Sequence, residues 1–296
     1  GLIEHNNIVS HQHQNKSSTS NWNSVGPIDP IYNGYVGIGR ITVIEFHPTN
    51  SNVIFVGTPG GGLWKSIDGG SNWLPLTDFL TNLGISDIAI DQSNPNIMFV
   101  ATGDRDARDT YGFGLLKSTD GGVTWSGTGL NMSVQDFNTV NRVLIDPNNS
   151  NNIIASTRTG IYRSTNGGAS FTQYFSGQSI ISMEFNPGNS SIVYAGEYDA
   201  NGNTASFYRS TDNGVNWSMV TSGLPSSESS RIQIAVSPNN NSTVYLLIAD
   251  DNYGLKGVYK STNNGVSFSL TANSPNILDS GDGSSSGGQG WYDLAI

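Results

Sequence analysis

The sequence predicts an all-β protein built from repeated four-stranded units, and three observations support this fold class. Glycine accounts for 36 of the 296 residues, and charged residues for only 12%, about half their usual share. Helix surfaces are normally rich in charged residues and poor in glycine, so this composition disfavours helices. Hydrophobic residues (35%) and aromatic residues (10%) still suffice to build a core. The third observation is an internal repeat, which determines the architecture.

One octapeptide recurs five times with the pattern Ser-x-Asp/Asn-x-Gly-x-x-Trp/Phe, and its copies start 46 to 52 residues apart. The copies are SIDGGSNW (Ser66–Trp73), STDGGVTW (Ser118–Trp125), STNGGASF (Ser164–Phe171), STDNGVNW (Ser210–Trp217) and STNNGVSF (Ser261–Phe268). Asp or Asn followed by Gly between apolar segments predicts a tight turn in which the side chain accepts backbone N–H groups. We therefore assign a structural role to Asp68, Asp120, Asn166, Asp212 and Asn263.

A calcium loop is the alternative interpretation of the octapeptide, because Asp and Asn at alternate positions resemble one. One side-chain oxygen in each copy is too few for a cation that takes six to eight oxygen ligands. The sequence therefore predicts no metal site and no cofactor, with calcium left as an unassigned alternative.

Three further strands complete each repeat. A strand that ends in a basic residue and Ser precedes every octapeptide (LWKS, LLKS, IYRS, FYRS, VYKS), and two strands joined by a polar turn come earlier. Four strands in each unit are the organisation of one blade of a β-propeller. We expect five full blades, with partial blades from strands at Asn21–Val25 and Gly290–Ile296. Residues 1–20 are expected to be a flexible tail, and 21–296 a propeller that is incomplete at its C-terminus.

Charge and composition exclude several classes of protein. The net charge of −10 disfavours nucleic-acid binding, which needs a basic surface. The absence of cysteine excludes disulfides and thiolate chemistry. No run approaches 18 apolar residues, so no membrane span is predicted. Lysine is rare while Asn, Ser, Thr and Gly are abundant, which is typical of an exported bacterial protein.

The octapeptides resemble the Asp-box, or BNR, repeat of sialidases, sortilin-type receptors and xyloglucan-cleaving glycoside hydrolases, over roughly residues 21–296. The segments NWNSVGP, GRITVIEFHPTNSNVIFVGTPGGGLWKSIDGGSNW and GGQGWYDLAI are similar to secreted BNR-repeat proteins of Bacteroidetes. Such proteins often carry a sorting domain for type IX secretion. The resemblance implies a β-propeller that is secreted or held at the outer cell surface.

The resemblance assigns no catalytic residue. Sialidases grip the substrate carboxylate with three arginines, the first in a Tyr/Phe-Arg-Ile-Pro motif, whereas this chain has Gly39-Arg40-Ile41-Thr42. The arginines available for such a triad are Arg40, Arg105, Arg108, Arg142 and Arg231. Xyloglucan hydrolases place a catalytic Asp directly after a Thr and just before the Gly-Gly of the first blade. Here that position is Pro59, which cannot act as an acid or a base.

The connections after the second and fourth strands of each blade form the expected ligand face. They vary most in length, and binding residues usually lie on loops over a rigid scaffold. Tyr and Trp can stack on sugar rings, and carboxylates can accept hydroxyl hydrogen bonds or hold a cation. The candidate binding residues are Asp104, Arg105, Asp106, Arg108, Asp109, Tyr111, Tyr198, Asp199, Asp250, Asp251, Tyr253, Trp291, Tyr292 and Asp293. The alternative for 104–109 is a loop in which Asp and Arg pair with one another.

A column of mostly polar residues is expected near the propeller axis. It comprises Val43, Asp87, Arg142, Ser182, Gln233 and Asp293, one from each inner strand. These side chains line a hydrated channel or form the floor of a ligand site, and we include Asp87, Arg142 and Gln233 among the candidate binding residues.

Together these features predict a non-enzymatic propeller that binds a glycan or a protein. The alternative is a glycoside hydrolase, xyloglucanase-like or sialidase-like, with catalytic carboxylates partly outside this chain. A further expected partner is the remainder of the polypeptide, or a companion chain, against Gly290–Ile296.

Overall fold

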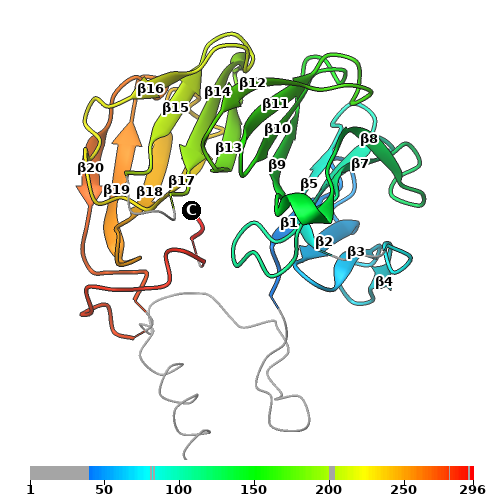
Figure 1. Cartoon of the computed structure of the whole chain (residues 1–296), viewed down its shortest axis with the longest axis horizontal. Helices are drawn as coiled ribbons and strands as arrows, with labels where there is room; N and C mark the ends of the chain where they lie inside the picture. Colours follow the sequence, from blue (N-terminus) through cyan, green and yellow to red (C-terminus); the bar gives the residue numbers. More distant parts are fainter. Residues whose placement is uncertain (1–39, 81, 83, 200–203, 280, 293) are drawn as a thin grey trace, which may run out of the picture.

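In the described part of the chain, twenty strands form five four-stranded antiparallel sheets, which confirms the predicted all-β fold class. The computed structural model describes residues 40–80, 82, 84–199, 204–279, 281–292 and 294–296. Within these ranges the only helical element is the single 3-10 turn η1 (Val134–Asp136). The sheets follow one another in chain order along an arc, and each is one blade (Figure 1). The expected tail at 1–20 and the strand at Asn21–Val25 lie outside the described residues.

Every blade runs from an inner strand to an outer strand in sequence order. Blade 1 contains β1 (Val43–Phe46), β2 (Ile54–Thr58), β3 (Gly62–Ser66) and β4 (Leu74–Pro75). Blade 2 contains β5 (Ile85–Ile90), β6 (Met98–Thr102), β7 (Gly114–Ser118) and β8 (Ser126–Asn131). Blade 3 contains β9 (Val140–Ile145), β10 (Ile153–Thr157), β11 (Gly160–Ser164) and β12 (Thr172–Ser176). Blade 4 contains β13 (Ile180–Asn186), β14 (Asn189–Glu197), β15 (Phe207–Ser210) and β16 (Ser218–Val220). Blade 5 contains β17 (Arg231–Val236), β18 (Val244–Ala249), β19 (Leu255–Ser261) and β20 (Ser269–Ala272).

The octapeptides form equivalent turns between the third and fourth strands. In blade 1 the Ser66 hydroxyl donates to Asp68 Oδ1 at 2.8 Å, and the same oxygen accepts the backbone N–H of Asn72 at 2.9 Å. Gly70 has φ 91°, a conformation that favours glycine. The other copies repeat the bond to the backbone, from Thr124 to Asp120 (2.9 Å), Ser170 to Asn166 (3.0 Å), Asn216 to Asp212 (2.8 Å) and Ser267 to Asn263 (3.0 Å). The predicted turn geometry is therefore confirmed.

The basic residue before each of four octapeptides reaches the octapeptide of the following blade. Lys117 Nζ donates to the carbonyl of Gly167 at 2.8 Å, and Arg163 Nε donates to the carbonyl of Asn213 at 2.9 Å. Arg209 makes the same bond to Asn264 at 2.7 Å. These residues thus link neighbouring blades.

The core lies between neighbouring blades. Phe55 and Leu63 of blade 1 pack with Ile85 and Met98 of blade 2, and all four are almost completely buried. Similar clusters join blades 2 and 3, 3 and 4, and 4 and 5. Each buried large apolar side chain contributes roughly 1.5–3 kcal/mol. The blades therefore form a rigid support for the loops between them.

The C-terminal segment differs from the prediction. The described residues of 290–296 form turns and coil, where the sequence predicted an inner strand. Leu294 instead packs on Leu247, Ala249 and Leu278 of blade 5 and the loop after it. No helix in the described part of the chain is long and apolar enough to cross a membrane.

Candidate functional site

The loop at 103–112, which follows β6, joins residues from several blades in a buried ionic network. Arg40 forms an ion pair with Asp104, and Arg231 pairs with Asp106 at 2.7 Å. Arg105 donates to the carbonyl of Thr42 at 3.1 Å. Asp104 also accepts the backbone N–H groups of its own loop. The two carboxylates are thus paired with arginines from elsewhere in the chain and act as structural groups.

Residues close to the C-terminus pack against this network. The Arg40 guanidinium lies 4.8 Å from the centre of the Tyr292 ring, and Arg231 donates to the Trp291 carbonyl at 2.6 Å. The Trp291 and Tyr292 rings lie 4.8 Å apart. Asp293 lies outside the described residues. These contacts give the two aromatic residues packing partners within the molecule.

The predicted residues at 250–253 form a turn of their own. Asp250 Oδ1 accepts the backbone N–H groups of Asn252 and Gly254, both at 2.9 Å. Asp251 is exposed, and the carbonyl of Tyr253 accepts the N–H of Gly290 at 2.8 Å. Asp250 therefore has a structural role in its loop.

The inner column forms a second ionic cluster. Asp87 pairs with Arg142 at 2.8 Å and also accepts the N–H of Val143 at 2.8 Å. Arg142 contacts Glu184 at 2.6 Å as well. Burial, and next the negative charge of Asp87, raise the pKa of the nearby Glu45 to about 7. Gln233 lies half-buried on β17 in blade 5.

A polar pocket of about 460 Å³ lies at the ends of blades 3 and 4, on the face where the sequence predicted a ligand. It brings together three of the predicted residues, Arg108, Tyr198 and Asp199. The other side chains that give it polarity are Arg158, Gln178, Ser179, Glu197, Thr204, Ser206 and Tyr208. Of the remaining candidates, Asp109 is exposed, and Tyr111 packs its ring 5.1 Å from Phe137. We call this cavity the polar pocket.

Glu197 is the group in the polar pocket best suited to proton transfer. Its Oε2 accepts the backbone N–H of Ser206 at 3.0 Å and the hydroxyl of Tyr208 at 3.4 Å. Burial raises the pKa of Glu197, and the negative charge of Asp199 raises it further against these hydrogen bonds. A carboxyl that keeps its proton at higher pH can act as a general acid.

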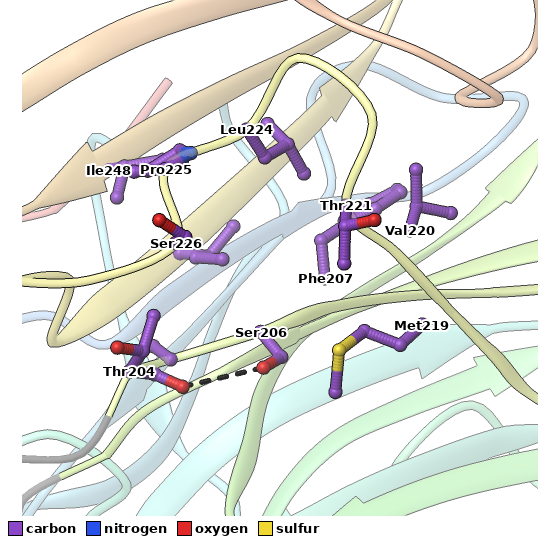
Figure 2. Close-up of a pocket in the computed structure, with 12 residues that line it drawn as sticks. Thr204, Ser206, Phe207, Met219, Val220, Thr221, Leu224, Pro225, Ser226 and Ile248 are labelled. Carbon is purple, nitrogen blue, oxygen red and sulfur yellow. Dashed lines mark hydrogen bonds between the residues drawn. The ribbon is translucent and has the colours of Figure 1, made fainter.

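An apolar pocket of about 210 Å³ adjoins the polar one, because Thr204, Ser206 and Met219 line both. Figure 2 shows its side chains, with Leu224 and Val220 among them and a hydrogen bond of 3.3 Å from the Ser206 hydroxyl to the Thr204 carbonyl. Its lining contains no acid or base, so it offers apolar contact and no chemistry. Within the described residues, no group of three or more His, Cys, Asp or Glu is placed to hold a metal ion.

Sequence reasoning missed Glu197, Arg158 and Glu45. Glu197 directly precedes the predicted residues Tyr198 and Asp199, but its partial burial could not be known from the sequence. Arg158 lies in a turn of ordinary length between β10 and β11, so loop length gave no signal. The sequence did contain a signal for Glu45, because it is an acidic residue between two apolar residues, Ile44 and Phe46, of a predicted strand.

Comparison with known proteins points to one class of enzyme. No family model matches the chain. It is 27% identical over 225 residues to a xyloglucanase of Hypocrea jecorina, which covers 71% of this chain and 25% of that protein. It is 30% identical over 223 residues to a xyloglucanase of Acetivibrio thermocellus, and this match covers 62% of this chain and 26% of that protein. The chain thus spans about a quarter of the length of these curated relatives.

A solved structure gives the same result. The GH74 enzyme of Niastella koreensis superposes with a TM-score of 0.63 at 26% identity, covering 80% of this chain and 38% of that chain. The prediction of a non-enzymatic binding propeller is therefore wrong in its main form, because the similar proteins are glycoside hydrolases. The repeat could not decide this point, since one fold hosts many functions. The chain is an all-β propeller whose fold is similar to that of GH74 enzymes.

Proposed function

We propose that this chain is part of a glycoside hydrolase of the xyloglucanase type, which cleaves a branched β-glucan bound in the polar pocket. The similarity to xyloglucanases supports the reaction class. The observation that carries the assignment to this pocket is the raised pKa of Glu197, a half-buried carboxyl beside Asp199 in a cavity lined by hydroxyl and guanidinium groups.

Glu197 acts as the general acid in this proposal. Both hydrogen bonds from Ser206 and Tyr208 end on Oε2, so Oε1 is left to carry the proton. That proton passes to the glycosidic oxygen as the bond between this oxygen and the anomeric carbon breaks. Hydrolysis by this route needs a second carboxylate on the other side of the sugar. Asp199, which lines the same pocket, supplies it as the base for a water molecule or as a nucleophile.

Pro59 occupies the position where the resemblance implies a catalytic Asp, so the catalytic carboxylates of this proposal must come from other positions of the chain. The resemblance to xyloglucan hydrolases implies an Asp there, whereas the Pro59 carbonyl accepts the Thr110 hydroxyl at 2.8 Å and so holds two loops together. A structural bond has taken the place of an ionisable group. The polar pocket, which lies on the same face of the propeller as Pro59, contains two carboxylates, those of Glu197 and Asp199.

The inner column is the other place where a carboxyl has a raised pKa. Glu45 and Glu184 lie beside Arg142 and Asp87, but none of these four residues lines either of the two pockets described. A sugar needs a cavity as well as an acid. We therefore assign the inner column to structure and the polar pocket to catalysis.

The proposal includes an extracellular place of action, because a polysaccharide too large to enter the cell must be cut outside it. It also includes the interpretation of the octapeptides as Asp-boxes of the BNR type. The missing length relative to the xyloglucanases is supplied by the remainder of the polypeptide or by a companion chain.

The test is the release of reducing ends from polysaccharides by the protein at its natural length. The substrates are xyloglucan, an unbranched β-glucan and a branched polymer bearing glucuronic acid, and mass spectrometry identifies the oligosaccharide products. We expect cleavage of at least one branched polymer. A folded protein that releases no product from any of them contradicts the proposal.

A further inference from the structure

The polar pocket has a cationic wall made of two arginines from different blades. Arg108 lies on the long loop after β6 in blade 2, and Arg158 lies in the turn between β10 and β11 in blade 3. Burial and then the positive charge of Arg108 lower the pKa of Arg158. Two like charges are therefore held close together in a chain with a net charge of −10, at an electrostatic cost.

These two arginines differ from the six others of the chain. Four of the others form ion pairs with carboxylates, and two donate to the octapeptide of the next blade; they are Arg40, Arg105, Arg142, Arg231, Arg163 and Arg209. Across the described residues, no carboxylate oxygen lies within 4.0 Å of Arg108 or Arg158. Among the residues that the structure describes, no carboxylate therefore neutralises the charge of either arginine by direct contact.

The contacts that the two arginines do make hold them in place and leave donors for a ligand. The Arg108 guanidinium lies over the Tyr198 ring, 5.2 Å from its centre. Arg158 donates Nη1 to the carbonyl of Phe137 and interacts with the side chain of Tyr111. A guanidinium has five N–H donors, so these contacts use only part of its capacity.

The backbone at Arg108 is strained. Its φ is 63°, in the left-handed region that is unfavourable for a non-glycine residue. Glycine or asparagine would adopt this conformation at less cost, so the turn alone does not explain an arginine. Strain of this kind is concentrated at binding sites.

We propose that the polar pocket binds a saccharide through an acidic substituent, the carboxylate of a uronic acid, held between Arg108 and Arg158. The planar guanidinium fork matches a carboxylate with two parallel hydrogen bonds. Glu197 and Tyr208 of blade 4, which line the same pocket, contact the uncharged part of the sugar in this proposal. That the ligand is a glycan rests on the proposed function; that it is acidic rests on the two arginines.

The test is calorimetric titration of the Glu197→Gln variant, in which turnover does not interfere. The probes are a disaccharide of glucuronic acid and xylose, its neutral analogue with glucose in place of glucuronic acid, and a sulfated analogue. We expect the uronic-acid disaccharide to bind about tenfold more tightly than the neutral one, because hydrogen bonds to charged groups are the stronger ones. Arg158→Gln should remove this preference, and affinity for the neutral analogue should stay the same.

Lys256→Gln is the matched control, because Lys256 is a cation outside the pocket that pairs with Glu228 at 2.9 Å. It should leave the preference intact. Equal binding of the acidic and neutral disaccharides, or an unchanged preference in Arg158→Gln, overturns the proposal. Tighter binding of the sulfated analogue overturns the assignment to a carboxylate. A preference for the acidic sugar in a protein that cleaves nothing would contradict the proposed hydrolase and leave this site standing.

Discussion

The Lys65 ammonium of blade 1 donates a hydrogen bond of 3.1 Å to the carbonyl of Gly121, inside the octapeptide of blade 2. The same ammonium lies 5.1 Å from the centre of the Phe55 ring on the neighbouring strand. One residue of the repeat therefore joins a contact within its own blade to a contact with the next blade. This explains why the basic position recurs with the octapeptide.

A pair of matched variants measures how much the hydrogen bond between blades contributes to the free energy of unfolding. Lys117 and Lys260 both lie over an aromatic ring, at 5.4 and 5.5 Å. Of the two, within the described structure, only Lys117 donates a hydrogen bond to a carbonyl of a following octapeptide. Lys117→Met should lower the free energy of unfolding by about 1–2 kcal/mol more than Lys260→Met, because it also loses a charged hydrogen bond. Denaturant unfolding gives both values. Equal losses would show that the bond between blades adds nothing.

The octapeptide turns predict an acid-dependent stability. Hydrogen bonds from Asn72 and Thr124 lower the pKa of Asp68 and Asp120 from 3.8 to about 2. A lowered pKa in the folded state gives stability above the ordinary value of the group that is lost as pH falls toward 2. The melting temperature of the double variant Asp68→Asn, Asp120→Asn should therefore fall less between pH 4 and pH 2.

Asn166 provides the reciprocal control, because its turn has the same geometry with a neutral side chain. Asn166→Asp should add acid sensitivity to the melting temperature. Parallel curves for all variants between pH 4 and pH 2 would contradict the assigned hydrogen bonds.

The raised pKa of Glu45 predicts that stability has the opposite dependence on pH near neutrality. Its pKa is raised to about 7 in the folded state, so its neutral form is favoured there. The corresponding stability is present below pH 4.5 and is lost as pH rises through about 7. Glu45→Gln should flatten the melting temperature between pH 5 and pH 8, as followed by circular dichroism. A wild-type curve with no downward slope in this range would contradict the raised pKa.

The ionic network around the loop at 103–112 is expected to carry stability. Asp106 and Arg231 are 8% and 2% exposed, so removing one partner leaves a buried charge. Asp106→Asn should cost about 3–5 kcal/mol of unfolding free energy. Glu228→Gln breaks the exposed pair with Lys256 and should cost far less, because water screens an exposed ion pair. Similar losses in both variants would show that the network is not a structural element.

The sequence predicted the features that repeat and missed those that depend on contacts between repeats. The octapeptides gave the five blades and the turn geometry around Asp68, because local hydrogen bonds determine both. They did not reveal that Asp104 and Asp106 pair with Arg40 and Arg231, which lie 64 and 125 residues away. Burial of Glu197 likewise depends on how blades 3 and 4 pack. The prediction of a non-enzymatic binding protein was corrected only by the similarity of the chain to xyloglucanases.

Cleavage by wild type and by Glu197→Gln is the measurement that tests the central claim most directly. Initial rates of reducing-end release are compared on the best substrate of the panel, with Glu228→Gln as the control and calorimetric binding of the product oligosaccharide as proof of an intact pocket. We predict a loss of at least about 100-fold in kcat for Glu197→Gln with binding retained, because general acids typically contribute 100- to 10,000-fold. Glu228→Gln should keep the wild-type rate. A Glu197→Gln protein that binds normally and keeps more than a tenth of the wild-type kcat would contradict the assignment of Glu197 as the general acid.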